Sequence, residues 1–205
     1  MEQSTFIKRL VARSEFGPLV LLVIMVLVFW QINPAFLSAR NIGNMLAFTV
    51  ELGLIALAMT LLMTAGEFDL SVGSLFGFCP VLMWTLYNTE VTSIEVGFAL
   101  ALAAAVAVGL VSGLFVTRLK IPSFLVTLGM LLVVRGTALF VTSGFPQRTW
   151  NASDLALAEI LVGSFKIAGL RLHMSLLWFV VVATALGYVL TQTRIGNWIQ
   201  AAVGN

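Results

Sequence analysis

The sequence predicts an all-α integral membrane protein, a polytopic helical bundle with about six transmembrane helices. Of its 205 residues, 60% are hydrophobic and only 10% are charged, whereas soluble domains carry about 25% charged residues. With a mean hydropathy of +1.05, the chain cannot cover its surface with polar groups in water. Its long uncharged runs predict helices, because the strands of a β-barrel would alternate polar and apolar residues.

Uncharged runs and turn residues along the chain place the expected helices. The first run follows the basic residues Lys8, Arg9 and Arg13 and is long enough to cross about 30 Å of hydrocarbon. It exceeds the apolar core of a signal peptide and lacks a small-x-small cleavage site, so an uncleaved helix is expected. The expected helices are Pro18–Ile32, Ile42–Met63, Leu70–Tyr87, Val96–Val116, Ile121–Thr142 and Leu172–Thr191.

Basic residues in the short loops predict a cytoplasmic amino terminus, because Lys and Arg favour the cytoplasmic side. Segment 1–15 then lies inside, residues 16–205 form the transmembrane domain, and a longer loop at about 143–171 lies outside. Arg40 is the short-loop exception. The outer loop is either a docking surface for an external partner or a plain connector lying on the membrane. The basic residues expected inside are Lys8, Arg9, Arg13, Arg118, Lys120 and Arg194.

The stretch Thr64–Phe78 contains two carboxylates, Glu67 and Asp69, between the uncharged segments 52–66 and 70–89. A charge deep in a bilayer is costly unless it is paired, hydrated or facing a cavity. The stretch therefore predicts a broken or tightly turned backbone in a membrane protein that moves something. The small and polar residues around the two acids are Gly66, Ser71, Gly73 and Ser74.

Two further ionisable residues, Glu51 and Arg135, fall within the expected second and fifth helices. One interpretation is that they face a common polar interior as an ion pair, which would lessen the desolvation cost of each charge. The other is that each side chain lies near a helix end and extends to the membrane interface. Both interpretations remain open at the level of sequence.

The expected fourth helix carries small residues at a strict four-residue spacing. This spacing aligns them in one smooth ridge that a neighbouring backbone can approach closely. The ridge indicates either packing within the same subunit or a dimer seam or sliding surface. Its residues are Gly97, Ala101, Ala105, Gly109 and Gly113.

No catalytic constellation is visible in the sequence. His173 has no second histidine or clustered acid near it, and the single cysteine, Cys79, lies in an apolar run and is interpreted as a buried, inert thiol. The chain also lacks a Walker A sequence, a GxSxG turn and an HExxH helix. We therefore expect no enzyme activity, cofactor, metal or nucleic-acid partner, and an energy source in an ion gradient or another subunit.

Four segments, in order, resemble ribose-type ABC transporter permeases, the inner-membrane components of binding-protein-dependent sugar importers. Glu67-Phe-Asp-Leu-Ser-Val-Gly-Ser74 is similar to the family's glycine-x-Asp-Leu-Ser-Val-Gly-Ser signature. Glu51-Leu-Gly-Leu-Ile-Ala-Leu-Ala-Met-Thr60 resembles its second helix, and Ile121-Pro-Ser-Phe-Leu-Val-Thr-Leu-Gly-Met130 with Arg135-Gly136 resembles its Pro-led helix. The segments Thr193-Arg-Ile-Gly-Asn197 and Ala202-Val-Gly-Asn205 resemble the entry to its cytoplasmic coupling region.

Three features depart from the family pattern. Glu67 stands where the family usually has a second glycine, which adds a charge and is expected to stiffen the turn. Val203 stands where a glycine is common. Family members are also longer, so the resemblance implies that this chain is an amino-terminal fragment or a truncated product.

The resemblance implies a sugar permease of the bacterial plasma (inner) membrane, working with a second permease subunit, cytoplasmic ATP-binding subunits and a periplasmic or extracellular sugar-binding protein. The implied pathway or gate residues are Asp69, Ser71, Gly73, Ser74, Glu51 and Arg135. The implied contacts to the ATPase are Arg194, Gly196, Asn197 and Asn205. The alternatives are an ion-coupled secondary transporter using Glu51, Glu67 and Asp69, and a protein whose polar turn is purely structural.

Overall fold

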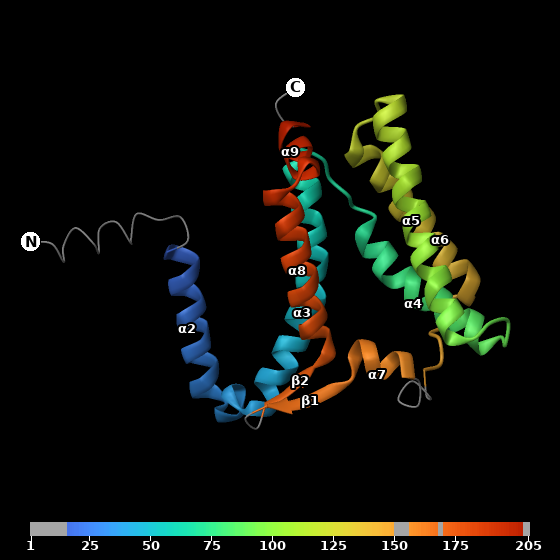
Figure 1. Cartoon of the computed structure of the whole chain (residues 1–205). Coiled ribbons are helices and arrows are strands. Elements are labelled where there is room, and N and C mark those ends of the chain that lie inside the picture. The colour runs from blue at the N-terminus through green and yellow to red at the C-terminus, as the bar shows by residue number, and fades with distance from the viewer. Residues whose placement is uncertain (1–15, 150–155, 168–169, 203–205) are drawn as a thin grey trace, which may run out of the picture.

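The computed structural model describes residues 16–149, 156–167 and 170–202, and nearly all of its regular structure is helical (Figure 1). The expectation of an all-α membrane bundle is confirmed, with one short antiparallel hairpin added, formed by β1 (Ser164–Ile167) and β2 (Leu170–His173). The helices are α2 (Phe16–Ile32), the 3₁₀ turn η1 (Pro34–Leu37), α3 (Ala39–Thr64), α4 (Val72–Asn88), α5 (Ile94–Leu119), α6 (Ser123–Thr142), α7 (Ala156–Val162), α8 (Met174–Gln192) and α9 (Arg194–Ala201).

Four helices, α3, α5, α6 and α8, are long and apolar enough to cross a membrane, and α2 is a shorter apolar helix. Each of the six expected helices has a counterpart, but several helix ends differ from the sequence prediction. α6 begins at Ser123 because Pro122 holds the extended N-cap position. α8 begins at Met174 because the preceding residues pair in the hairpin. α4 begins at Val72, after an extended stretch.

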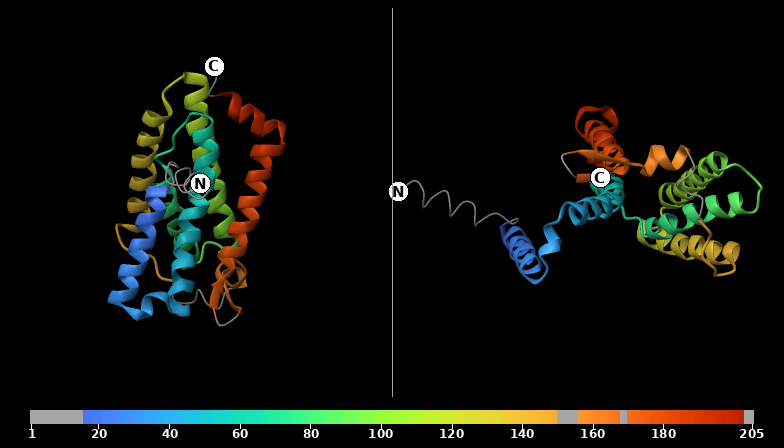
Figure 2. Two further views of the ribbon diagram at one scale, coloured as in Figure 1. Left: turned by 90° about the vertical axis from the view of Figure 1, so that its left-hand side faces the viewer. Right: turned by 90° about the horizontal axis from the view of Figure 1, so that it is seen from below.

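The helices form two groups that run side by side (Figures 1 and 2). In the first group α3 packs against α8, and α9 and the hairpin lie against them. In the second group α4 packs against both α5 and α6. Among the described residues, α2 stands apart and packs mainly against η1, which in turn contacts α3 (Figure 2). We call the two ends of the bundle the α9 end, which also holds the α5–α6 turn, and the hairpin end.

Close helix packing in both groups depends on small residues, as in other membrane bundles. A Cβ added to Gly53 of α3 would lie 2.7 Å from the ring of Phe179 on α8. A Cβ on Gly43 would collide with the carbonyl oxygen of Arg171 in β2. These glycines therefore set how closely α8 and the hairpin approach α3. Most large apolar side chains remain exposed on the outer faces of the helices, where lipid tails solvate them as well as protein would.

The small-residue ridge lies on α5. Because α4 is shorter than α5, it covers only the first half of the ridge. Gly97 and Ala101 are buried, and a Cβ on Gly97 would lie 3.2 Å from the Met83 carbonyl oxygen of α4. Ala105 is half-buried, whereas Gly109 and Gly113 are exposed and would meet nothing within 4 Å. The first half of the ridge therefore packs within the chain, and the second half faces away from it.

Candidate functional site

The backbone breaks at the end of α3, as the sequence predicts. Gly66 adopts a left-handed conformation, with φ of 78°, and its N–H donates to the Met63 carbonyl at 3.0 Å. The N–H of Glu67 donates to the Leu62 carbonyl at 3.2 Å. These two bonds form a Schellman motif, in which glycine is preferred at the left-handed position. Glu67 does not have a positive φ. A side chain at this position, where the family usually has a second glycine, therefore causes no backbone strain.

Asp69 organises the start of α4. Its Oδ1 accepts hydrogen bonds from the Ser71 N–H at 2.7 Å and from the Ser71 hydroxyl at 2.6 Å. Ser71 is the N-cap residue, is 1% exposed, and its carbonyl accepts from the Ser74 hydroxyl at 2.7 Å. Carboxylate acceptors make stronger hydrogen bonds than neutral ones, and a negative charge is favourable near a helix N-terminus. Asp69 is therefore held in place by the backbone that it caps.

The extended stretch between α3 and α4 is also attached to α6. The Phe68 N–H donates to the Ser123 hydroxyl at 3.2 Å, and the Thr127 hydroxyl lies 3.5 Å from the Phe68 carbonyl oxygen. Thr127 is 3% exposed. Neither α6 residue was predicted as a site residue from the sequence, although Ser123 directly follows Pro122 at the start of α6.

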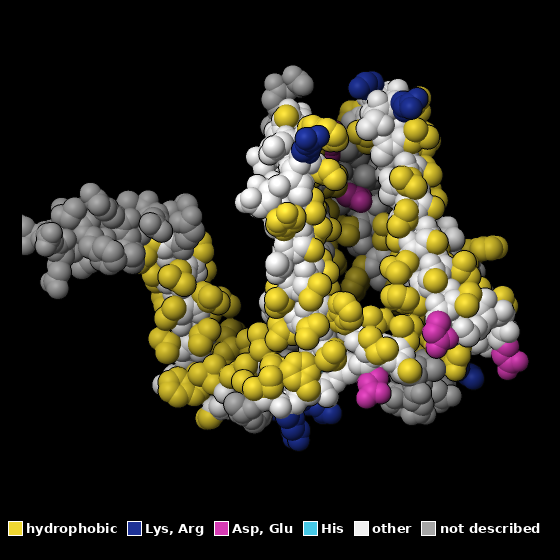
Figure 3. Space-filling view, in the orientation of Figure 1, with side chains coloured by type: hydrophobic (Ala, Val, Ile, Leu, Met, Phe, Trp, Pro, Cys, Tyr) yellow, Lys and Arg dark blue, Asp and Glu magenta, His cyan; other side chains and the backbone are white. Residues whose placement is uncertain are grey.

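This stretch runs from the α9 end back into the depth of the bundle, so α4 starts partway along its neighbours (Figure 1). α4 and α5 share a turn at the hairpin end, and α4 has 17 residues against 26 in α5. At 1.5 Å per residue, the start of α4 lies about 13 Å short of the far end of α5. Acidic side chains are visible within the opening between the two helix groups (Figure 3). Simple alternation of complete spans would have placed the acidic turn at the helix ends.

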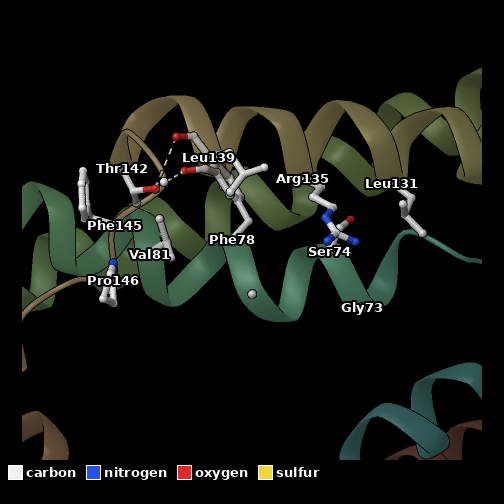
Figure 4. A pocket seen from close by; sticks show the side chains of 13 residues that line it. Gly73, Ser74, Phe78, Val81, Leu131, Arg135, Leu139, Thr142, Phe145 and Pro146 are labelled. Carbon is white, nitrogen blue, oxygen red and sulfur yellow. Dashed lines mark hydrogen bonds between the residues drawn. The ribbon is translucent and has the colours of Figure 1, made fainter.

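A pocket of about 660 Å³ lies between α4 and α6, beside the start of α4. Arg135 extends from α6 toward Ser74, and they form one end of the pocket with Gly73 (Figure 4). Its other end is apolar and aromatic, lined by Phe78, Val81, Leu139, Phe145 and Pro146. Among the residues that the structure describes, Arg135 is the only charged one in this lining. The guanidinium and the Ser74 hydroxyl offer hydrogen-bond donors, and Phe78 and Phe145 offer aromatic faces, to a ligand in this pocket.

The structure brings some of the predicted pathway residues together and leaves one apart. Gly73, Ser74 and Arg135 line the pocket, and Asp69 and Ser71 lie at the adjoining helix start. Glu51 is exposed on α3, in the other helix group. No ion pair joins Glu51 and Arg135 within the part of the chain that the structure describes. The aromatic lining of the pocket was not anticipated, because apolar side chains in a membrane helix carry no signal of their own.

Three of the predicted coupling residues, Arg194, Gly196 and Asn197, fall on α9, which turns sharply off α8. A Cβ on Gly196 would collide with the backbone of Val189 and Leu190, so this turn requires glycine. The Thr193 hydroxyl accepts from the Gly196 N–H at 3.3 Å and caps the helix. Arg194 and Asn197 are exposed on α9. Asn205 and Val203 lie outside the described residues.

Curated relatives of this chain are named as sugar permeases. The chain is 32% identical to the xylose/arabinose import permease protein XylH of Sulfolobus acidocaldarius, over 97% of this chain and 55% of that protein. It is 31% identical to the ribose import permease protein RbsC of Escherichia coli K12, over 93% of this chain and 58% of that protein. The L-arabinose ABC transporter permease protein AraH of Azospirillum brasilense is 35% identical, over 84% and 48% respectively. The chain thus spans about half the length of these relatives.

No solved structure matches the chain. A family match covers residues 41–205, which include the broken helix, the pocket and α9. The family match and the four helices that are long and apolar enough to cross a membrane support a multi-pass protein of the plasma membrane. The protein belongs to the family described as branched-chain amino acid transport system / permease component.

Proposed function

We propose that this chain acts as the transmembrane permease subunit of an ABC importer for a sugar such as ribose or a related monosaccharide. The observation that supports it most directly is the broken segment between α3 and α4, which carries Asp69 and Ser71 into the depth of the bundle. Non-helical backbone at membrane depth is tolerated where it lines a cavity or is buried in protein. The names of the relatives supply the substrate class.

The proposed pathway or gate is built around the start of α4. A sugar is neutral and rich in hydroxyls, so it needs scattered donors and acceptors and an aromatic face. Arg135 and Ser74 offer the donors, and Phe78 and Phe145 offer the aromatic faces. Asp69, Ser71 and Gly73 shape the neighbouring backbone, and Glu51 stands on the other helix group.

The energy source in this proposal is a separate pair of cytoplasmic ATP-binding subunits, and the permease itself hydrolyses nothing. A second permease subunit completes the pathway, and a sugar-binding protein delivers the substrate outside. The contact to the ATPase is assigned to Arg194, Gly196, Asn197 and Asn205. Two apolar side chains of α9 support a docking role, because Ile195 is 56% and Trp198 is 71% exposed.

The proposed orientation places the α9 end in the cytoplasm, in the inner membrane of a bacterium. This end carries Arg118, Lys120 and Arg194, and basic residues in short loops favour the cytoplasmic side. The amino terminus would then be cytoplasmic, because α2 runs toward the hairpin end (Figure 1).

The experiment that tests this function is uptake of labelled ribose, xylose and arabinose into proteoliposomes that contain the chain with its ATP-binding subunit and sugar-binding protein. We expect uptake of at least one sugar that requires both partners and ATP and that continues when ionophores collapse ion gradients. Uptake that needs a proton or sodium gradient and no ATPase would instead indicate ion coupling through Glu51, Glu67 and Asp69. ATP-independent flux of this kind would refute the proposal.

A further inference from the structure

A second polar pocket lies at the bend between α2 and α3, away from the candidate pathway. Its volume is about 520 Å³. It lies at the hairpin end, where α2 ends and α3 begins (Figure 1). Its lining combines one cation with amides and a hydroxyl, and comprises Asn33, Ala35, Phe36, Ser38, Arg40, Asn41, Asn44 and Met45. Arg40 is the short-loop exception to the expected distribution of basic residues.

The pocket offers hydrogen-bond donors that the protein itself does not use. Within the described part of the chain, neither the Arg40 guanidinium nor the Asn44 amide donates a hydrogen bond. The Asn41 amide, in contrast, donates to the Phe36 carbonyl at 2.7 Å, and the Ser38 hydroxyl accepts from the Asn41 N–H at 3.3 Å. The first turn of α3 is therefore already capped. Among the described residues, the donors that remain for a ligand are the side chains of Arg40 and Asn44.

The charge of the pocket is positive. None of the described residues that line it is acidic. Glu51, on the same helix, is 11 residues further along α3 than Arg40, which is about 16 Å at 1.5 Å per residue. A guanidinium with an adjacent amide matches the acceptor oxygens of a phosphate group, so the complementary ligand is an anion.

The depth of the pocket corresponds to the lipid headgroups. α3 has 26 residues and is therefore about 39 Å long, which exceeds the roughly 30 Å hydrocarbon core. Its first turn, which carries Arg40, extends past the hydrocarbon into the interfacial layer. Phosphate groups of phospholipids lie in this layer.

The space between α2 and the α3–α8 pair, next to the pocket, is apolar and open. α2 has no buried residue and carries no charged one. The space-filling view shows an open gap between α2 and the α3–α8 pair, with hydrophobic side chains along α2 (Figure 3). Among the described residues, the main connection between the two helices is η1, which contacts both of them at the hairpin end. Acyl chains fit this arrangement, with their headgroup at the bend.

We propose that the bend between α2 and α3 binds one anionic phospholipid, with its phosphate at Arg40 and Asn44 and its acyl chains between the two helices. This site is independent of the proposed transport function and uses none of its residues. Under the proposed orientation, it also gives a reason for a basic residue in a short loop on the outer side, where the positive-inside rule disfavours such residues.

Native mass spectrometry of the purified full chain, titrated with phosphatidylglycerol, tests the proposal. We expect Arg40→Gln to weaken retention of the lipid about fivefold, the usual contribution of one basic residue near an anionic membrane surface. Asn44→Asp keeps Arg40 but adds a negative charge to the pocket, and it should weaken retention similarly. Arg40→Lys keeps the charge and should retain most of the binding. Circular dichroism checks that each variant remains helical.

Lys166→Gln is the matched control, because it removes one exposed cation at the same end of the protein. It should leave lipid retention unchanged. Equal retention by Arg40→Gln and the wild type, or equal loss in Arg40→Gln and Lys166→Gln, would overturn the proposal. Phosphatidylcholine should be retained less than phosphatidylglycerol. An excess of inorganic phosphate should fail to displace the lipid, and complete displacement would show a site for free phosphate and refute the lipid assignment.

Discussion

Asp69 accepts hydrogen bonds from both the backbone N–H and the hydroxyl of Ser71, at 2.7 Å and 2.6 Å. One carboxylate oxygen thus fixes the residue from which α4 starts, inside the bundle. This arrangement explains why an acid is useful in so apolar a chain, because it replaces the solvent that a helix start in water would use.

Asp69→Ala should abolish sugar uptake and leave the sugar affinity of the separate binding protein intact. The substitution removes both hydrogen bonds, and bonds to a charged group contribute about 1.5–3 kcal/mol each. Asp69→Asn is the control, because the amide oxygen still accepts from Ser71; it should retain measurable uptake. Normal uptake by Asp69→Ala in the proteoliposome assay would remove Asp69 from the mechanism.

Gly66→Ala should destabilise the protein, because Gly66 has φ of 78° and a left-handed conformation costs other residues roughly 1–2 kcal/mol. The melting temperature in detergent measures this effect. Glu67→Gly at the neighbouring position should lack this penalty, since Glu67 has no positive φ. An unchanged melting temperature for Gly66→Ala would contradict the Schellman geometry.

Gly97→Leu and Gly109→Leu should have different effects, although both lie on the small-residue ridge of α5. Gly97 packs against the Met83 backbone, and overpacking there should lower stability by about 1–3 kcal/mol. Gly109 would meet nothing within 4 Å, so its replacement should leave the melting temperature unchanged. If the exposed half of the ridge is a seam between subunits, Gly109→Leu should also reduce self-association, which cross-linking in membranes measures.

Gly196→Ala should distort the turn between α8 and α9, because the added Cβ collides with the backbone at Leu190. We expect a lower melting temperature and, under the proposed function, loss of sugar-stimulated ATP hydrolysis in the assembled transporter. Gly187→Ala on α8 is the matched control, since a Cβ there meets nothing within 4 Å. Equal behaviour of the two variants would show that the turn tolerates a side chain.

The proposed orientation is tested with single cysteines in a Cys79→Ser background. Thr89→Cys, in the α4–α5 turn, should react with a membrane-impermeant maleimide added to intact cells. Lys120→Cys, in the α5–α6 turn, should react only after the membrane is opened. The reverse pattern would place the α9 end outside and contradict the charge-based orientation.

Much of the helical architecture was predictable, because runs such as Val96–Val116 are too apolar and too long for any other structure. The break at Gly66 was also predictable, since glycine, serine and two acids interrupt the apolar sequence there. The start of α4 at mid-depth was not, because hydropathy gives the length of a run and not the height at which it begins.

The hairpin was missed for a different reason. Leu172 and His173 directly precede an apolar run, so the sequence predicts that they start its helix. In the structure they pair with Phe165 and Ser164 instead. Such pairing depends on residues that meet only in the folded chain. The same holds for the Arg135 pocket, where residues of α4 and α6 meet.

The extended stretch before α4 has a further consequence for what fills the opening between the two helix groups. Among the hydrogen bonds of the described residues, the N–H groups of Asp69 and Leu70 have no acceptor. Hydrocarbon cannot satisfy them, and each unpaired group in lipid costs several kcal/mol. Under the proposed function we therefore expect water to reach this depth from the α9 end and to hydrate the opening as far as the start of α4.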